Sequence, residues 1–371
     1  MNSGDRLHVL LVSTWYPAHD KPFDGLFVRD QARAVSLYCE VTVVSPTAAG
    51  MPRDSADGQL RVLRVLPNGA GLMANIRRFL VIAAVVRQLR REGRGPDLIH
   101  AHVYYTAFLA VLVGRLYGVP VVVSEHLSDI IEGLLSRFHA AFARFTFRSA
   151  AVVCPVSSVL KRSLAVLEPR GRYIVVGNSV DVEAFASPTF RARACTRPSL
   201  LTVGGLFKYK GIPYLLEALR VLLGNHPNAR LEIAGDGPDR DELEAMAEGL
   251  PVVFLGPRSR SEVAALMRKA DVLVMPSIVE TFGIAPLEAL AAGLPVVATS
   301  AFPTADVISE LGGVIVPPRD SPALADAISR LVGGRSHAQD NAAAEIAGRF
   351  GLETSGRRWR VIYDGVIHGA S

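Results

Sequence analysis

Short apolar runs recur along the chain and alternate with longer stretches in which apolar residues return at helical spacing. The runs predict buried strands over 7–12, 40–45, 60–66, 97–102, 120–123, 151–155, 200–203, 229–234, 252–255, 272–275 and 296–298. The stretches between them predict helices, among them 26–37, 158–167, 212–223, 241–248, 261–269 and 322–331. Strands that alternate with helices are typical of α/β proteins with parallel sheets. We therefore expect an α/β fold, in which the polar segment 47–58 forms a loop.

The segment from 272 to 298 places two carboxylates at one end of a predicted strand. Pro276 and Ser277 end the strand 272–275, and a loop containing Gly283 follows. Pro286 is predicted to be the first residue of the next helix, because proline has no N–H to leave unsatisfied there. Glu280 then lies in the loop, and Glu288 lies in the first turn of the helix.

This arrangement suits a ligand that carries both phosphate and hydroxyl groups. Ligands of open α/β sheets bind outside the carboxyl ends of the strands. The free N–H groups of a helix start bind phosphate, and carboxylate oxygens accept hydrogen bonds from hydroxyls. A second interpretation stays open, in which Glu288 only complements the helix dipole and Glu280 is a solvated loop residue.

A second candidate phosphate loop follows the strand 200–203. It contains Gly204, Gly205, Lys208 and Lys210, and it leads through Gly211 into the helix 212–223. Glycines and lysines between a strand and a helix can hold a diphosphate. The spacing matches neither a P-loop nor a dinucleotide fingerprint, so the pattern excludes an NAD-dependent dehydrogenase.

The first half of the chain contains three histidines and a glycine that are candidate site residues. His126 follows the strand 120–123, where an imidazole can donate a hydrogen bond to a sugar hydroxyl or a phosphate. His100 and His102 end the strand before it, and His102 is a second candidate to line the site. Gly25 is either an ordinary turn glycine or a point of close backbone approach to a ligand.

Residues 280–298, Glu-Thr-Phe-Gly-Ile-Ala-Pro-Leu-Glu-Ala-Leu-Ala-Ala-Gly-Leu-Pro-Val-Val-Ala, resemble the signature of the family-4 retaining glycosyltransferases. The resemblance extends over nearly the whole chain and implies the GT-B architecture, in which two Rossmann-like domains with parallel sheets face a cleft. It implies an acceptor-side domain over 1–185, a turn at 177–181, a linker over 185–198 and a donor-binding domain over 199–349. A C-terminal helix, 350–368, would pack back on the first domain.

The resemblance also implies roles for individual residues. Catalytic roles fall on His126, Lys210 and Glu280, with His126 beside the transferred sugar and Lys210 on the leaving diphosphate. Donor binding falls on Gly25, Gly205, Lys210, Arg258, Glu280, Phe282, Gly283, Ile284 and Glu288. Within that set Glu288 would bind the ribose, and the turn 256–258 would contact the base.

The chain departs from the family pattern at three places. Gly205 stands where the family has an arginine, and Lys208 or Arg258 are candidates to replace its charge. Ser179 stands where glycine is usual, and the turn 301–306 lacks the usual glycines.

The implied function is transfer of a sugar, with retention, from a UDP- or GDP-sugar to a glycan or lipid-linked acceptor in cell-surface polysaccharide synthesis. We expect no metal, no other cofactor and no nucleic-acid partner. The Asp239-Arg-Asp241 motif matches a metal-binding pattern, but acidic residues at a helix start are expected from the dipole alone. A sugar-nucleotide epimerase and a catalytically degenerate scaffold remain alternatives.

Charge and composition indicate where the protein acts. Residues 1–190 hold 21 Lys and Arg against 15 Asp and Glu, which suggests an anionic partner for this half. The predicted helices 73–94 and 134–148 are rich in arginine and could lie on an anionic membrane, or simply expose a solvated arginine face. No apolar run is long enough for a spanning helix, and the N-terminus leads directly into a strand. Three scattered cysteines, Cys39, Cys154 and Cys195, fit reduced thiols, so we expect a cytoplasmic protein.

Overall fold

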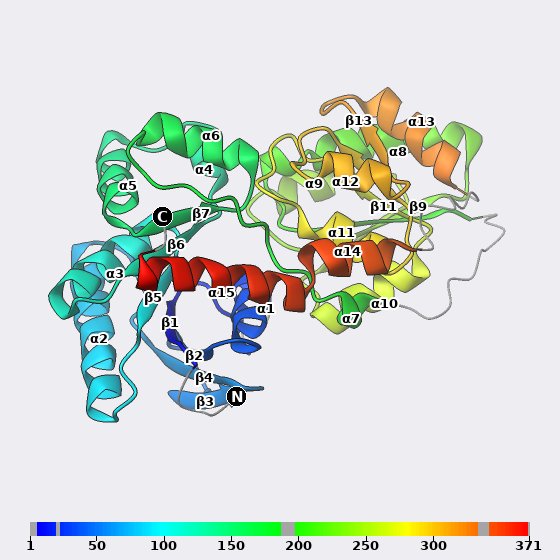
Figure 1. The fold of residues 1–371 in the computed structure, drawn as a ribbon. Coiled ribbons are helices and arrows are strands. Elements are labelled where there is room, and N and C mark those ends of the chain that lie inside the picture. Colours follow the sequence, from blue (N-terminus) through cyan, green and yellow to red (C-terminus); the bar gives the residue numbers. More distant parts are fainter. Residues whose placement is uncertain (1–5, 20–22, 187–196, 333–340, 370–371) are drawn as a thin grey trace. The chain divides into compact units, whose positions relative to one another are not determined.

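The computed structural model describes residues 6–19, 23–186, 197–332 and 341–369 (Figure 1). It divides the chain into two compact units. The first comprises residues 1–179 and 352–371, and the second comprises residues 180–351. Most of the predicted linker 185–198, together with Cys195, lies outside the described residues.

The first unit is built on a seven-stranded sheet in the order β3-β4-β2-β1-β5-β6-β7. Only β3 pairs antiparallel, and the other neighbours are parallel. The strands are β1 (His8–Val12), β2 (Glu40–Pro46), β3 (Asp54–Asp57), β4 (Leu60–Leu66), β5 (Leu98–His102), β6 (Val121–Glu125) and β7 (Val152–Pro155).

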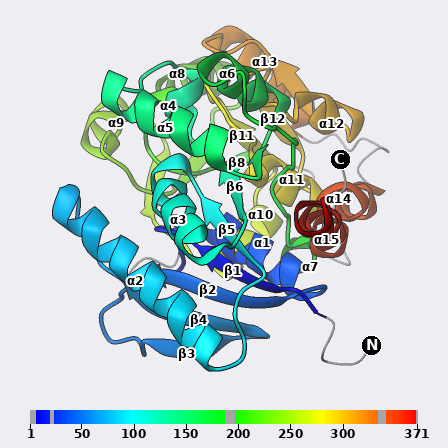
Figure 2. The same cartoon turned by 60° about the vertical axis from the view of Figure 1, so that its left-hand side comes forward.

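Helices cover both faces of this sheet. They are α1 (Leu26–Ser36), α2 (Leu72–Arg91), α3 (Tyr104–Tyr117), α4 (Ser128–Ile131), α5 (Arg137–Ser149), α6 (Ser158–Leu167) and α15 (Leu352–His368). α15 packs on α1 on one face, and α3 packs between α2 and α5 on the other (Figures 1 and 2). Trp359 and Tyr363 of α15 are fully buried in the core, so the last helix completes this unit.

The second unit contains a six-stranded, fully parallel sheet in the order β10-β9-β8-β11-β12-β13. The strands are β8 (Ser199–Val203), β9 (Arg230–Ala234), β10 (Val252–Gly256), β11 (Val272–Met275), β12 (Val296–Thr299) and β13 (Val314–Val316). The helices are α7 (Val182–Phe185), η1 (Lys208–Lys210, a 3₁₀ turn), α8 (Ile212–Asn225), α9 (Arg240–Met246), α10 (Arg260–Lys269), α11 (Ile284–Ala291), α12 (Ala305–Glu310), α13 (Ser321–Leu331) and α14 (Ala342–Phe350).

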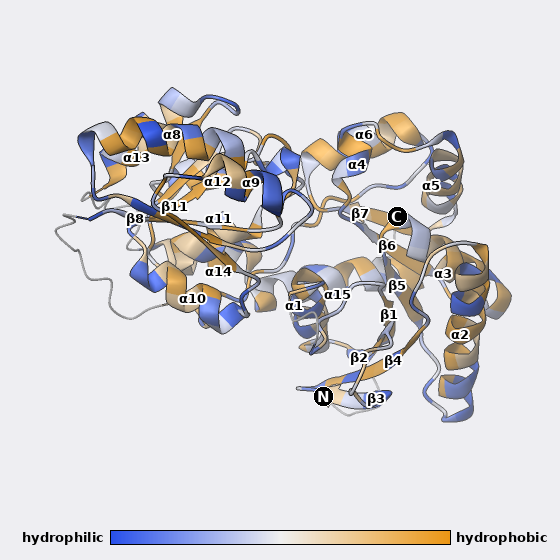
Figure 3. Cartoon of the chain, turned by 180° about the vertical axis from the view of Figure 1, so that it is seen from behind, coloured by the Kyte–Doolittle hydropathy of each residue, from blue (hydrophilic) through white to orange (hydrophobic). Residues whose placement is uncertain are grey.

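The central strands of both sheets are apolar because helices cover them on both faces (Figure 3). α8 packs on α13 and α9 over one face of the second sheet, while α7 and α14 pack on α11. The short helix α7 also contacts α10, which explains why the chain joins the second unit from residue 180 onward.

Two local predictions were wrong. Residues 54–57, predicted within a loop, form β3, because an exposed edge strand needs only backbone pairing with β4 and no apolar pattern. The helix predicted to begin at Pro286 begins at Ile284, and Glu288 therefore lies in its second turn. None of the described helices is both long and apolar enough to cross a bilayer. Cys39 and Cys154 are buried and not disulfide-bonded.

Candidate functional site

Two loops of the second unit meet at the carboxyl ends of β8 and β11. The Ile278 N–H donates to the Tyr209 carbonyl at 2.7 Å and joins the loop before α8 to the loop after β11. Gly211 has φ +68°, and a Cβ there would overlap the carbonyl of Pro276. The close approach of the two loops therefore requires glycine at this position.

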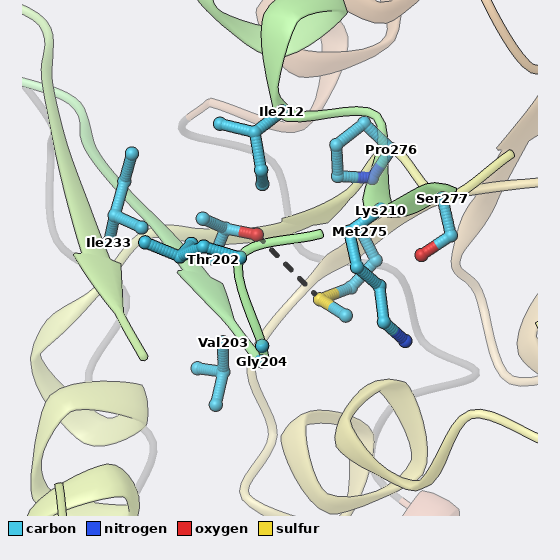
Figure 4. Close-up of a pocket in the computed structure, with 11 residues that line it drawn as sticks. Thr202, Val203, Gly204, Lys210, Ile212, Ile233, Met275, Pro276 and Ser277 are labelled. Carbon is cyan, nitrogen blue, oxygen red and sulfur yellow. Dashed lines mark hydrogen bonds between the residues drawn. The ribbon is translucent and has the colours of Figure 1, made fainter. Parts of the chain in front are cut away.

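A partly buried ion pair lies where these loops meet. Lys210 Nζ lies 2.6 Å from Glu280 Oε2, and the two side chains are 19% and 10% exposed. The other oxygen of Glu280 accepts from the N–H of Thr281 at 3.1 Å. Figure 4 shows Lys210 beside a small pocket lined by Thr202, Met275 and Ser277. The loops thus hold a cation and a carboxylate together.

The start of α11 lies directly after this pair. Gly283, with φ +85°, precedes the helix, and a Cβ there would overlap the ring of Phe302. The N–H groups of Gly283, Ile284 and Ala285 make no hydrogen bond within the described part of the chain. Pro286 is the third helical residue, where the missing N–H costs no helical bond. Free N–H groups at a helix start, close to a lysine, are able to bind an anion.

Glu288 lies one turn further into α11 and faces a second cation. Its side chain is 12% exposed, and Oε1 lies 4.0 Å from Arg260 Nη2. Arg260 also contacts Asp181 at 3.3 Å and covers the ring of Phe185. The sequence analysis did not select Arg260. Its only local signal is its position after Ser259, which caps α10 in a capping box with Glu262.

The other candidate cations make contacts outside this ion pair. Lys208 is 81% exposed and lies 3.9 Å from Glu242. Arg258 donates to the carbonyl of Pro257 at 3.2 Å, next to the turn at Gly256. A side chain at Gly205 would meet the ring of Phe207, which is 40% exposed and stacked on Tyr209. Lys210 is thus the less exposed lysine of this loop, at 19% against 81% for Lys208.

Histidines of the first unit form a stack at the ends of β5 and β6. The rings of His100 and His102 are 5.2 Å apart and nearly parallel, and so are those of His102 and His126. His102 Nδ1 lies 3.1 Å from His126 Nε2, and the ring centroids of Phe27 and His126 are 4.6 Å apart. Burial lowers the pKa of His126 to about 3, so its imidazole is neutral at pH 7.

Glu125 organises the loop that carries His126. It is fully buried, and its carboxylate accepts from the N–H groups of Tyr104, His126 and Leu127 at 2.9, 2.9 and 3.1 Å. Burial raises the pKa of Glu125 to about 7, against the effect of these hydrogen bonds. The sequence analysis missed Glu125, although an acid at the end of an apolar strand was a usable signal.

Gly25 begins α1 with φ +71° and lies against the backbone of Trp15 and Tyr16. A Cβ at this position would overlap those atoms. The structure therefore gives Gly25 a packing reason to be glycine, whether or not a ligand approaches it.

The structure brings Lys210, Glu280, Phe282, Gly283 and Ile284 together in the second unit. Gly25 and His126 lie in the first unit. No group of three or more His, Cys, Asp or Glu side chains is arranged to hold a metal within the described ranges. Asp239 precedes α9 and Asp241 lies in its first turn, as expected for helix-start acids.

Comparison with known proteins relates the chain to glycosyltransferase families. The profile of the family described as Glycosyl transferases group 1 matches residues 190–346, and that of Glycosyltransferase Family 4 matches residues 27–184. An uncharacterized glycosyltransferase of Methanocaldococcus jannaschii is 31% identical over 293 residues, which cover 72% of this chain and 75% of that protein.

Solved structures share the fold at lower identity. Sucrose-phosphate synthase from Thermosynechococcus elongatus superposes with a TM-score of 0.79 at 20% identity, over 98% of this chain and 100% of that one. Anabaena HepE in complex with UDP and glucose superposes with a TM-score of 0.74 at 20% identity, over 97% and 100%. The GT-B fold class predicted from the sequence is confirmed.

Proposed function

Because this chain belongs to the glycosyl transferases group 1 family and is a glycosyltransferase, we propose that it uses a nucleotide-diphosphate sugar and retains the configuration at the anomeric carbon. The observation that carries the proposal is the partly buried Lys210–Glu280 pair just before the N-terminus of α11. It offers a cation and free N–H groups for phosphate, with a carboxylate for hydroxyls.

Lys210 and the start of α11 stabilise the leaving group in this proposal. When the bond between the anomeric carbon and the diphosphate oxygen breaks, negative charge grows on that oxygen. Lys210 and the N–H groups of Gly283 to Ala285 are donors of the kind that stabilise such charge. The acceptor hydroxyl forms the new bond on the same face of the sugar, and its proton passes to the departing diphosphate.

The two glutamates bind hydroxyl groups of the donor. Glu280 exchanges its contact with Lys210 for hydrogen bonds from the sugar, once phosphate takes over the lysine. Glu288 accepts from the ribose hydroxyls while Arg260 keeps its charge balanced. The turn at 256–258 contacts the base through its backbone.

His126 contacts the transferred sugar as a neutral imidazole. Its Nδ1 is buried and unpartnered within the described residues, while Nε2 meets His102. A neutral ring can donate or accept one hydrogen bond without placing a second cation near the anomeric carbon.

The finer expectations from the sequence belong to the same proposal. The donor is a UDP-sugar in preference to a GDP-sugar, since the structural neighbour HepE binds UDP and glucose. The reaction needs no metal, because Lys210 and helix N–H groups meet the charge. The acceptor is a glycan or a lipid-linked sugar, and the enzyme works in the cytoplasm, at an anionic membrane, in cell-surface polysaccharide synthesis.

A thermal-shift series with UDP, GDP and ADP tests the donor site. A ligand that binds only the folded state stabilises the protein and so raises its Tm. At a ligand concentration one hundred times Kd, the free energy of unfolding increases by about 2.7 kcal/mol. We expect UDP to raise Tm in wild type and in Glu248→Ala, an exposed control on the same unit, but far less in Glu288→Ala. An equal shift in Glu288→Ala would remove Glu288 from the site.

Two further measurements test the chemistry. Proton NMR of the product should show the same anomeric configuration as the donor, and inversion would overturn the retaining assignment. Turnover should persist in excess EDTA. If no nucleotide binds and no sugar is transferred, the absence of arginine at Gly205 would favour the scaffold alternative.

A further inference from the structure

An apolar cavity of about 600 Å³ lies within the first unit between α2, α3 and α5. These three helices cover the same face of the sheet, with α3 in the middle (Figure 2). Ile76 and Phe79 of α2, Phe108 of α3, and Phe138 and Phe142 of α5 contribute to its walls. Its volume falls within the range of about 300–1,000 Å³ that is usual for small-molecule sites.

The rim of the cavity exposes large apolar side chains to solvent. Leu72 is 74% exposed and Phe138 is 68% exposed, and both line the cavity. Contiguous exposed apolar surface of this kind marks an interaction site more often than an ordinary surface. An occupant with an apolar body would bury both the walls and the rim.

The two outer helices are basic. Neither α2 nor α5 contains an aspartate or a glutamate, and both carry several arginines. Arg77 and Arg137 each adjoin a lining residue, Ile76 and Phe138 respectively, and neither forms an ion pair with any described residue. Adjacent helical residues point about 100° apart, so these arginines flank the cavity instead of filling it. The charge therefore selects an occupant with an anionic head and an apolar body.

The inner wall of the cavity adjoins the histidine stack. Tyr104 and Tyr105 line the cavity and follow His102 closely in the chain. The N–H of Tyr104 donates to Glu125, whose other oxygen holds the N–H of His126. Trp15 contacts the ring of Tyr105 and also that of Phe27, which covers His126. An occupant of the cavity is thus one layer of side chains from His126.

We propose that this cavity binds the hydrocarbon chain of a lipid phosphate that carries the sugar acceptor, with the arginines of α2 and α5 facing its phosphate. The inference rests on the proposed function and deepens it, because it selects a lipid-linked acceptor over a free glycan. A concave site next to His126 suits a single chain better than it suits the flat surface of a bilayer.

Binding of farnesyl phosphate, measured by calorimetry without any donor, tests the proposal. We expect saturable binding to wild type, and no binding of inorganic phosphate at the same concentration. Ile76→Trp, which fills the cavity from its half-exposed rim, should weaken binding at least tenfold. Val166→Trp is the matched control on α6, where an 84% exposed valine contributes nothing to the cavity, and it should bind as wild type does.

The double variant Arg77→Gln/Arg137→Gln tests the contact with the phosphate head group. This variant should weaken binding of farnesyl phosphate at least tenfold while leaving binding of farnesol unchanged, because only the charged contact is removed. Equal weakening for both ligands would contradict a phosphate contact. Circular dichroism of each variant establishes that it is folded.

Other occupants give different results, and each would overturn the proposal. Sedimentation with vesicles of phosphatidylglycerol, without binding of farnesyl phosphate in solution, would assign the surface to a bilayer. A concentration-dependent dimer that Ile76→Trp abolishes would assign it to a second copy of the chain. If farnesyl phosphate binds as expected but no nucleotide sugar is turned over, the proposed function fails and the lipid site stands.

Discussion

Lys210 and Glu280 balance each other's charge. Both side chains are mostly buried, and their charged atoms lie 2.6 Å apart. Removing one partner of a buried pair leaves an uncompensated charge, whereas removing both costs much less. A ligand that separates the pair must therefore supply an anion to the lysine and hydrogen-bond donors to the carboxylate.

We expect Lys210→Met to lower the free energy of unfolding by about 3 kcal/mol, at the lower end for buried pairs because of partial exposure. The double variant Lys210→Met/Glu280→Gln should recover most of that loss and remain inactive. Urea denaturation of both single variants and the double variant completes the cycle. Additive losses would show that the pair is not coupled.

Alanine substitutions at Gly25 and Gly50 distinguish the energetic cost of a left-handed backbone from the cost of a steric overlap. Both have φ +71°, but a Cβ at Gly50 meets nothing within 4 Å, whereas one at Gly25 overlaps the backbone of Trp15 and Tyr16. Alanine at Gly50 should cost about 1–2 kcal/mol for the left-handed conformation. Gly25→Ala should cost clearly more in urea denaturation followed by tryptophan fluorescence, and equal losses would contradict the close contact.

At the level of helices and strands, Glu125 joins the end of β6 to the start of α3. Its fully buried carboxylate accepts from three backbone N–H groups. α3 itself is apolar on nearly every side, because α2 and α5 cover it as well as the sheet. For that reason periodicity does not identify α3, since only a helix with one solvated face shows a helical pattern.

Glu125→Ala should lower the free energy of unfolding by about 2–4 kcal/mol, because it leaves buried N–H groups unsatisfied. It should also reduce kcat by displacing His126, although Glu125 does not touch the sugar in our proposal. Chemical denaturation and initial rates measure the two effects. If stability falls while kcat is unchanged, Glu125 has no part in positioning His126.

The dependence of stability on pH involves the first unit as a whole. Burial holds the pKa of His100 and His126 at about 3 and lowers that of His102, so the folded state keeps all three neutral. Their contribution is present above pH 6.5 and is lost as pH falls toward the folded pKa values. Glu125 has the opposite effect, because its pKa is raised to about 7. Its contribution to stability is present below about pH 4.5 and is lost as the pH rises to 7.

Between pH 6.5 and 4.5 the three histidines outweigh the single glutamate, so stability should fall as the solution is acidified. For each proton that the unfolded state binds and the folded state does not, the free energy of unfolding changes by about 1.4 kcal/mol per pH unit. His100→Asn, which removes a buried histidine outside the proposed sugar contacts, should reduce the slope by about that amount. Denaturation followed by Trp15 and Trp359, both in this unit, measures it at several pH values. An unchanged slope would show that His100 is not neutral when folded.

The amino-acid sequence alone was sufficient for the features that depend on neighbouring residues. Apolar runs located most strands because burial on both faces demands a continuous run, and turn residues located the loops after β8 and β11. Those loops carry Lys210 and Glu280, so their positions followed from local patterns. The exact start of α11 did not follow from the local pattern, because proline is tolerated at each position of the first helical turn.

Contacts between distant residues required the folded chain. Lys210 and Glu280 are 70 positions apart, and Arg260 reaches Asp181 across 79. The stacking of His102 on His126 depends on the register of β5 against β6, and the apolar cavity depends on how α2, α3 and α5 pack. Periodicity reports which face of an element is buried, but not which element covers it, so these pairings arise only from tertiary packing.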